Sequence, residues 1–160
     1  MGSPFKNCIF VVVRIKKFNS MSDHITTKWL GGMAFESNNP SGLDLKIDAA
    51  PDSGGAGDGL RPKALMLSAL AGCSGLDVAS LIKKMKLEVD DFRIETKAEL
   101  TEEHPRYYDS VKIEYHFTGP DLKEDKLQRA VDLSVEKYCG VMEMFRRFAT
   151  LEIEVFYHRS

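Results

Sequence analysis

The segment that most constrains the fold of this chain is a long apolar stretch from Pro62 to Met85, PKALMLSALAGCSGLDVASLIKKM. Between Ala64 and Ile82 it carries a single charge, Asp77. Proline suits the first turn of a helix, and the lysines near the end of the stretch suit the negative end of the helix dipole. At 1.5 Å per residue the helix would be about 36 Å long. We therefore predict one long central helix.

Apolar side chains are distributed around this helix without a clean polar face: Leu65, Met66, Leu67, Leu70, Leu76, Val78, Leu81 and Ile82. A helix that is apolar all round is buried on all sides. The interruptions by Ser, Gly and Asp argue against a membrane span, and no membrane partner is expected. Because one small sheet cannot cover such a helix, we predict that a second copy of the chain does so in a homodimer.

The composition describes one ordinary domain. The chain has 160 residues, 43% of them hydrophobic and 29% charged, which is typical of a soluble protein with a modest core. A net charge of −2 gives no electrostatic reason to expect nucleic acid as a partner. Three cysteines without tight spacing make no disulfide framework, so we expect a reducing cytoplasm and free thiols.

The first twenty residues differ from the rest. Their short apolar run, Ile9 to Val13, is broken by Arg14, and Met21 followed by Ser-Asp has the form of a natural start. We interpret residues 1–20 as an extension, artificial or natural, or as an added edge strand, and residues 21–160 as the single domain. Cys8 within the extension is given no role.

The pattern before the long helix predicts two strands. Residues 25–35 are predicted to form one strand that is bent or bulged at Gly31-Gly32. Residues 43–48 alternate apolar and polar side chains after a turn at residues 38–42. The Gly-rich loop at residues 49–59 has two interpretations. It could cradle a phosphate at the start of the helix, but its spacing fits neither known fingerprint, so a flexible connection is favoured.

Strict alternation after the helix predicts a strand hairpin, residues 92–100 and 111–117. A helix capped by Asp121 and running to about Tyr138, a second helix over residues 141–148 and a last strand over residues 151–157 complete the order. Strands are grouped rather than alternating with helices, so the predicted fold class is α+β with a mainly antiparallel sheet packed on the long helix.

Two cysteines are the leading functional candidates. Cys73 lies in the middle of the long helix, and Cys139 lies directly before the last helix, whose dipole would favour its thiolate. Their separation excludes a CxxC motif or a zinc ribbon. The alternative is that both are small buried hydrophobes with no chemistry. Asp77, one turn after Cys73, would raise the pKa of that thiol, whereas Arg61 and Lys63 could stabilise the thiolate if folding brought them near.

A cysteine hydrolase and a metal site were the other possibilities. The residues around Cys73 read Gly-Cys-Ser-Gly, but a nucleophile elbow needs a strand-to-helix turn and this cysteine is predicted inside a helix. The four histidines show no ligand spacing, so no metal and no cofactor are expected.

The segments RPKALMLSALAGCSGLDVASLIKKM, EEHPRYY and LQRAVDLSVEKYCGV resemble the OsmC/Ohr family of osmotically inducible and organic-hydroperoxide-resistance proteins. The resemblance covers roughly residues 21–158. It implies an OsmC-like α+β fold and an intertwined homodimer. It also implies a reactive cysteine at Cys73, a resolving one at Cys139, and thiol-dependent reduction of hydroperoxides.

This sequence departs from the hydroperoxide-resistance branch of the family at three places. Lys63 stands where that branch has a glutamate, residues 21–60 contain no arginine, and Gly140 follows the second cysteine in place of proline. The chain therefore resembles the OsmC-like branch more closely.

The predicted function is a cysteine-based redox protein that reduces organic hydroperoxides in oxidative-stress defence and is recycled by a thiol or dithiol reductant. Five residues could line an apolar substrate pocket: Met66, Leu70, Leu76, Asp77 and Met142. The alternative is a non-catalytic dimeric module that binds an apolar ligand or partner.

Overall fold

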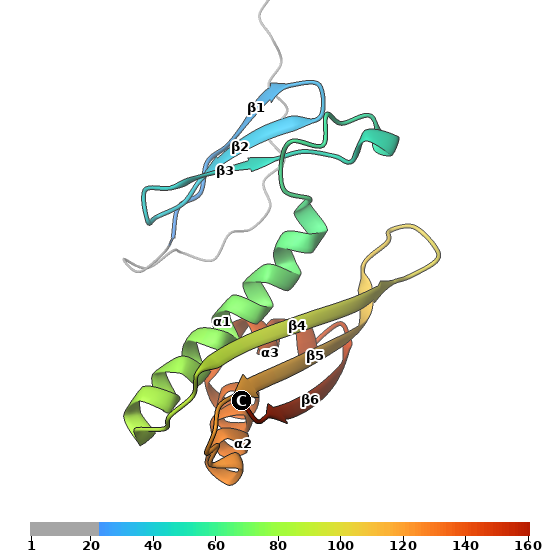
Figure 1. The fold of residues 1–160 in the computed structure, drawn as a ribbon. Coiled ribbons are helices and arrows are strands. Elements are labelled where there is room, and N and C mark those ends of the chain that lie inside the picture. Colours follow the sequence, from blue (N-terminus) through green and yellow to red (C-terminus); the bar gives the residue numbers. More distant parts are fainter. Residues whose placement is uncertain (1–22) are drawn as a thin grey trace, which may run out of the picture.

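The computed structural model describes residues 23–160, and the predicted extension of residues 1–20 lies outside them. The described chain is α+β, as predicted, with two three-stranded sheets connected by one long helix (Figure 1). The first sheet is an antiparallel meander of β1 (Thr27–Gly31), β2 (Ala34–Asn38) and β3 (Asp44–Ile47).

The predicted single strand over residues 25–35 is wrong, because the chain reverses direction within it. Gly31 and Gly32 both have positive φ, 109° and 53°, which side chains disfavour and glycine adopts freely. They form a tight turn between β1 and β2, and the Trp29 indole N–H donates to the Gly32 carbonyl at 3.0 Å. The pairing register is irregular between Trp29 and Gly31, as the predicted bulge implies, but the two glycines also end the strand.

The loop at residues 49–59 is organised around a buried carboxylate. Asp48 accepts hydrogen bonds from the backbone N–H groups of Ala49, Ala56 and Gly57 at 2.8–2.9 Å. A short 3-10 helix, η1 (Pro51–Ser53), lies between them. The Gly-rich loop therefore does surround an anion, but the anion is the protein's own Asp48, and the predicted flexible connection is corrected to a loop held in place.

The long helix, α1 (Pro62–Met85), has the predicted bounds. It ends at Lys86, which adopts the left-handed conformation with φ 54° and donates its N–H to the Ile82 and Lys83 carbonyls. Only one stripe of the helix is buried within this chain, consisting of Leu70, Ser74, Val78 and Leu81. The prediction that α1 is covered on all sides is therefore not met by the chain alone.

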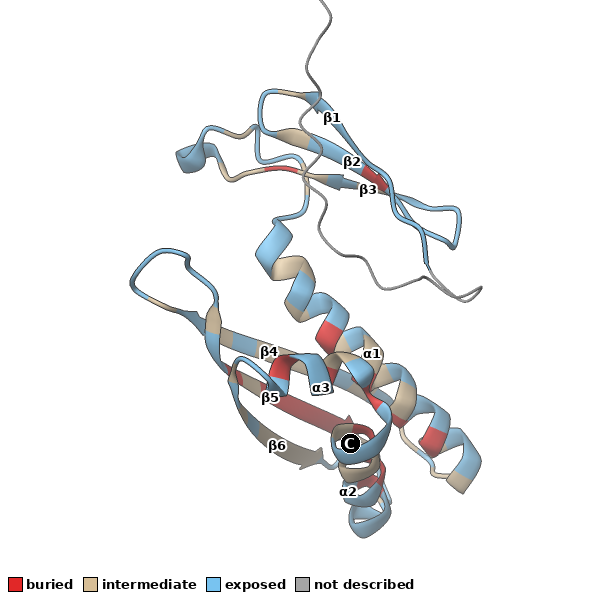
Figure 2. Cartoon of the chain, turned by 180° about the vertical axis from the view of Figure 1, so that it is seen from behind, coloured by how far each residue is buried: buried red, intermediate tan, exposed pale blue. Residues whose placement is uncertain are grey.

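By length and composition alone, α1 could also cross a membrane, with a mean hydropathy of 1.7 over its most apolar window. Core helices of folded domains meet the same two criteria. Here α1 packs against β4, α2 and α3, so its buried stripe faces protein (Figure 2).

The second sheet consists of β4 (Asp91–Leu100), β5 (Tyr108–Thr118) and β6 (Thr150–His158). The predicted hairpin is confirmed: β4 and β5 are antiparallel and in register from Asp91–Thr118 to Ala98–Val111. β6 lies on the other side of β5 and runs parallel to it. A parallel neighbour requires a crossover connection, which the helices between β5 and β6 supply.

Three helical segments form this crossover: α2 (Glu124–Leu133), a π-helical turn η2 (Ser134–Tyr138) and α3 (Gly140–Arg146). The predicted cap at Asp121 is wrong, because α2 begins after Lys123 and the Asp121 carboxylate pairs with the Lys123 ammonium at 2.6 Å. The break between the two predicted helices is confirmed, and the π-helical turn places Cys139 at that break.

The core lies between the helices and one face of the second sheet (Figure 2). Alternation along β5 sends Val111, Ile113, Tyr115 and Phe117 toward the helices. They meet the inner stripes of α1, α2 and α3, whose buried apolar members include Leu70, Val78, Leu127, Ala130, Val131, Met142 and Phe145. This closed core holds one of the two thiols.

Candidate functional site

The candidate site contains the two described cysteines, which the fold brings together from distant parts of the sequence. Cys73 lies in the middle of α1 and is partly buried, while Cys139 caps the start of α3 and is buried. Both pack in the same core cluster, and Cys73 is near enough to act on the pKa of the Cys139 thiol. Neither is in a disulfide.

Cys139 is held as a protonated thiol. Burial raises its pKa to about 11, and the neighbouring Cys73 adds to the increase. The Met142 N–H, which donates to the Cys139 sulfur at 3.3 Å, acts in the opposite direction without prevailing. The prediction that the helix start would favour a thiolate here is therefore wrong, because desolvation outweighs the contribution of a short helix.

Beside the thiols lies a buried network of hydroxyl groups. The Ser74 hydroxyl contacts the Tyr115 hydroxyl at 2.5 Å and the Ser134 hydroxyl at 2.9 Å. Ser134 also donates to one carboxylate oxygen of Asp77, at 3.2 Å. The network joins α1, β5 and η2, so it fixes the three elements that carry or flank the cysteines.

Tyr115 remains a neutral hydrogen-bonding group in this network. Burial raises the pKa of its hydroxyl to about 12, and the acidic neighbours Cys139 and Asp77 contribute in the same direction, against the hydrogen bond to Ser74. Asp77 thus accepts a hydrogen bond from the buried Ser134 hydroxyl.

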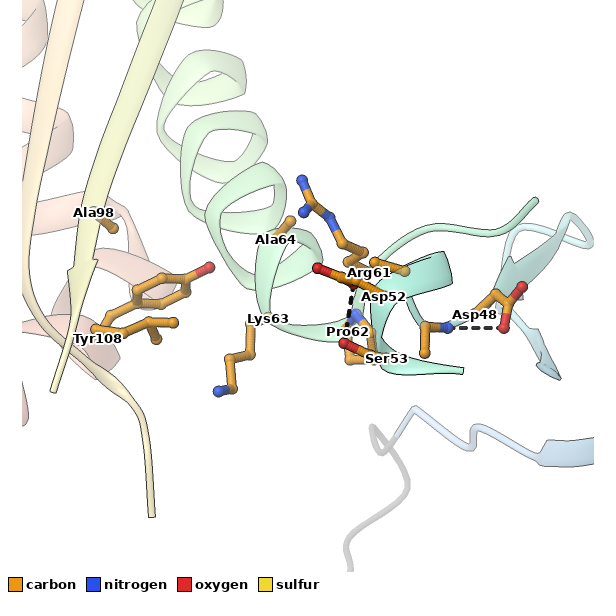
Figure 3. A pocket seen from close by; sticks show the side chains of 12 residues that line it. Asp48, Asp52, Ser53, Arg61, Pro62, Lys63, Ala64, Ala98 and Tyr108 are labelled. Carbon is orange, nitrogen blue, oxygen red and sulfur yellow. Dashed lines mark hydrogen bonds between the residues drawn. The ribbon is translucent and has the colours of Figure 1, made fainter. Parts of the chain in front are cut away.

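The two predicted thiolate-stabilising cations lie at the far end of α1. Arg61 precedes the helix and Lys63 is in its first turn, so each is roughly 15 Å or more from Cys73 along the helix axis. They line a cavity of about 670 Å³ with Asp48, residues of the η1 loop, Ala98 and Leu100 of β4 and Tyr108 of β5 (Figure 3). Neither cysteine lines that cavity.

The five predicted pocket residues are divided between core and surface. Leu70 and Met142 are fully buried in the core beside Cys139, while Met66 and Leu76 point outward and Leu76 is 75% exposed. Asp77 lies between these groups in the hydroxyl network. In a single chain these side chains do not share one face.

Sequence reasoning missed the hydroxyl network, although two signals were present. Tyr115 occupies an inward position in the alternation of β5, and a buried tyrosine hydroxyl needs a partner. Ser134 follows the buried Leu127 and Ala130 at helical spacing, so it shares their inner face, which is where such a partner would lie. Ser74 carried no signal of its own, because a serine beside a cysteine in an apolar helix has many uses.

The fold and the site together define a class of protein. Its members are α+β chains that carry one thiol on a long core helix and a second thiol beside it, at the start of another helix. The sequence profile of the OsmC-like protein family matches residues 55–154, more than half of the chain. This protein belongs to the OsmC-like family.

Relatives support this assignment. Protein YhfA of Escherichia coli K12 is 36% identical over 121 residues, which cover 75% of this chain and 87% of YhfA. A hypothetical protein of Aquifex aeolicus VF5 has a similar structure, with a TM-score of 0.77 and 29% identity over 87% of this chain and 98% of that one. The organic hydroperoxide resistance protein OhrB of Bacillus subtilis shares the fold, with a TM-score of 0.60 and 23% identity over 84% and 98%.

Proposed function

We propose that this protein is a thiol-dependent hydroperoxide reductase in which Cys73 reacts with the peroxide and Cys139 resolves the product. The observation that carries the proposal is the unequal pair of thiols: Cys73 is partly exposed, while Cys139 is buried beside it and protonated. A two-cysteine peroxidase needs one thiol that substrate can reach and a second that stays unreactive until the first is oxidised.

In the first step the Cys73 thiolate attacks one peroxide oxygen. A sulfur–oxygen bond forms, the O–O bond breaks, and the alkoxide leaves as an alcohol after taking a proton. Cys73 is oxidised to a sulfenic acid and the peroxide is reduced by two electrons. The substrate must therefore reach the Cys73 sulfur, and the Cys73 residue on α1 is only partly buried.

In the second step the Cys139 sulfur attacks the sulfenic sulfur of Cys73. A disulfide forms, and the hydroxide that leaves takes the Cys139 proton to become water. Because its pKa is about 11, Cys139 carries that proton at neutral pH. An external thiol or dithiol then reduces the disulfide by exchange, as expected in a reducing cytoplasm.

The names of related proteins support a hydroperoxide as substrate. The Bacillus subtilis protein OhrB and a Legionella pneumophila OsmC, TM-score 0.65 and 16% identity, are both described as organic hydroperoxide resistance proteins. YhfA carries no functional description. Lys63 and Gly140 distinguish this chain from the hydroperoxide-resistance branch, so its preferred substrate is part of what must be measured.

We further propose that the functional unit is an intertwined homodimer. Leu76 and Met66 on α1 and Trp29 on the first sheet are large apolar side chains that the described chain leaves exposed. An obligate interface that covers them would bury about 2,000 Å² or more in total. A second subunit could also bring Arg61 and Lys63 to the Cys73 thiol, which they do not approach along their own helix.

The proposal is tested by a pulse of cumene hydroperoxide followed by mass spectrometry, with turnover measured under a dithiol reductant. Wild type should form the Cys73–Cys139 disulfide. Cys73→Ser should lose peroxide reduction entirely, whereas Cys139→Ser should be oxidised once at Cys73 and then fail to turn over. Cys8→Ser is the matched cysteine control and should behave as wild type.

A second variant addresses the cation. If the dimer brings Arg61 near Cys73, Arg61→Gln should slow the oxidation of Cys73 severalfold, because a cation beside a thiolate stabilises it. Wild-type protein that keeps Cys73 as a free thiol under excess peroxide would refute the reductase proposal. The alternative of a binding module for apolar ligands would then stand.

A further inference from the structure

The outer face of the second sheet carries an acidic row that the proposed function does not use. Glu95 on β4 lies opposite Glu114 on β5, which lies beside Glu154 on β6. Successive strand residues point to opposite faces, so this row faces away from the helices and the cysteines. Like charges on directly opposed positions destabilise a sheet, and three carboxylates side by side need cations between them.

Lysines supply part of that charge. The Lys97 ammonium contacts both oxygens of Glu114 at 2.8 and 2.9 Å, and Lys112 contacts Glu114, Glu152 and Glu154 at 2.9–3.5 Å. Glu114 therefore forms ion pairs with two lysines, although it is only 7% exposed.

The remaining neighbour of the row is the buried ring of His116. Its plane is fixed by stacking on Phe156, with ring centroids 4.7 Å apart, and its Nδ1 lies 3.0 Å from Nε2 of His158. His116 is 8% exposed. Two imidazoles in hydrogen-bond contact share one proton, so either His116 or His158 is the donor of this bond.

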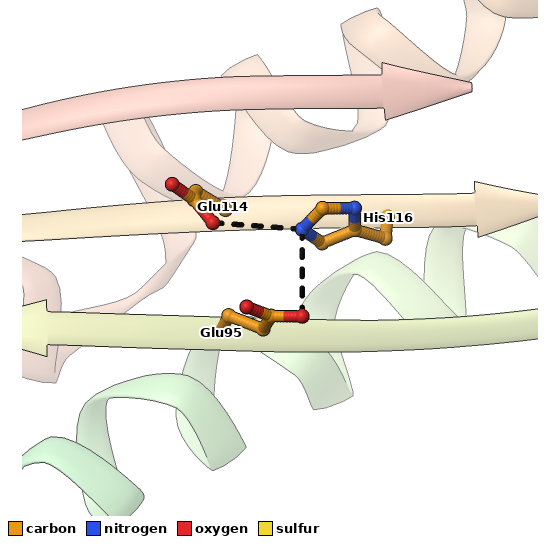
Figure 4. A group of neighbouring side chains, drawn as sticks. All are labelled: Glu95, Glu114 and His116. Carbon is orange, nitrogen blue, oxygen red and sulfur yellow. Dashed lines mark ion pairs between the residues drawn. The ribbon is translucent and has the colours of Figure 1, made fainter. Parts of the chain in front are cut away.

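The other ring nitrogen of His116 has no hydrogen-bond partner within residues 23–160, and it points into the acidic row (Figure 4). Nε2 lies 3.7 Å from a Glu114 oxygen and 3.9 Å from a Glu95 oxygen. Both distances are too long for hydrogen bonds. Both are short enough for a single ion to bridge, since two metal–ligand bonds of about 2.0–2.2 Å each span at most roughly 4.4 Å.

We propose that Glu95, Glu114 and His116 bind a divalent transition-metal ion, for which Zn²⁺ serves as the probe. One imidazole nitrogen and two carboxylates form a donor set that suits such ions, and all ligand atoms lie within 4.8 Å of one another. With His116 Nδ1–H donating to His158, the Nε2 lone pair faces the ion, and His158 orients the ligand. The bound ion clamps β4 to β5.

Lys97 is the competitor of this ion. Its ammonium occupies the Glu114 oxygens, but its side chain is 61% exposed and can turn into solvent. The site therefore predicts opposite effects for two neighbouring changes. Removing a ligand weakens binding, while removing the Lys97 charge strengthens it.

The test is calorimetric titration with ZnCl₂ of a Cys8→Ser, Cys73→Ser, Cys139→Ser background, so that thiolates do not bind the metal. We expect one ion per chain. His116→Gln and Glu95→Gln should each weaken binding at least tenfold, and Lys97→Gln should tighten it severalfold. His158→Gln, which removes only the orienting partner, should weaken binding by about 10–100-fold. Glu152→Gln, a carboxylate on the same face outside the ligand set, should change it little.

Nitrogen-15 NMR of the imidazole rings provides a readout that does not depend on how the variants fold. Zn²⁺ should shift the Nε2 resonance of His116 and leave that of His104, on the distant hairpin loop, unchanged. An affinity weaker than about 1 mM, or equal affinities in the background protein and His116→Gln, would overturn the proposal.

Discussion

The two sheets of this protein have three strands each but are supported very differently. The second sheet packs one face against three helical segments, and its inward residues on β5 are fully buried. The first sheet exposes Trp29, Leu30, Met33, Phe35 and Leu43, while its buried residues, Ser37 and Asp48 beside it, are polar. The apolar face of the second sheet is covered by helices of the same chain, whereas the apolar side chains of the first sheet are not covered by the described chain.

This difference locates where a partner is needed. A two-layer domain is stable because each apolar face meets another one. The second sheet meets this condition within the chain, while the first sheet and the outer side of α1 do not. Four predictions test the contrast, from the largest expected effect to the smallest.

The largest effect is expected in the completed sheet. Phe117 is fully buried and stacks on Phe92, with ring centroids 4.7 Å apart. Phe117→Ala should lower the free energy of unfolding by about 3–5 kcal/mol, because it removes a buried ring and leaves a cavity. Guanidinium denaturation measures this loss. Tyr107→Ala, an exposed aromatic on the same hairpin, is the control, and an equal loss there would contradict the contrast.

The second prediction concerns the first sheet, where Trp29 is 63% exposed in the single chain. If a second copy covers it, Trp29→Asp should weaken the dimer by about 2 kcal/mol or more, as hot-spot aromatics do. Sedimentation should then show monomer at concentrations where wild type is dimeric, and the melting temperature should depend more strongly on protein concentration. An unchanged mass distribution would place the partner surface elsewhere.

The third prediction concerns the hydroxyl network that joins α1 to β5. Ser74→Ala leaves the buried Tyr115 hydroxyl without its 2.5 Å partner and should cost about 1–3 kcal/mol. Tyr115→Phe in the same protein should recover part of that loss, because the unpaired hydroxyl is then absent. Ser68→Ala is the control on the same helix, since Ser68 is exposed and bonds only to the Ala64 carbonyl. Equal losses at the two serines would refute a role for the network.

The smallest effect concerns pH. The pKa of Cys139 is about 11 in the folded chain against an ordinary value of 9.0, so folding is favoured while the thiol is protonated. This contribution is full below pH 9 and is lost as the pH rises through 11. At pH 8, in a Cys8→Ser, Cys73→Ser protein, iodoacetamide should modify Cys139 about tenfold or more slowly in the folded state than in urea, because burial, the largest cause of the raised pKa, remains when Cys73 is replaced. Equal rates in the two states would contradict the raised pKa.

Local patterns predicted the parts of the fold that depend on short-range physics. The bounds of α1 follow from Pro62 and the lysines near its end, and the β4–β5 hairpin follows from strict alternation. The Gly31-Gly32 turn was missed because a bulge and a tight turn use the same residues. The parallel pairing of β6 depends on the crossover helices, which no local pattern reports.

The candidate site was predictable only in outline. Both cysteines were identified from their residue type and helix positions, but the protonation state of Cys139 depends on burial by residues distant in sequence. Leu70 is buried and Leu76 is exposed because the chain covers only one stripe of α1. The sequence periodicity of α1 does not show which stripe is covered, because every face of the helix carries apolar side chains. His116 and Glu95 come together through strand register, which spacing within the sequence does not show.

The loop that folds around Asp48 limits which amino-acid substitutions this part of the protein surface can accept. Gly55 and Gly59 lie in a surface loop where substitution is ordinarily tolerated, yet a Cβ at Gly55 would collide with the Ala49 carbonyl, and one at Gly59 would lie 2.7 Å from the Asp48 backbone nitrogen. Asp52 and Ser53, at the exposed tip of the same loop, carry no such restriction. A library of random changes across this loop should therefore recover substitutions and short insertions at its tip and almost none at these two glycines.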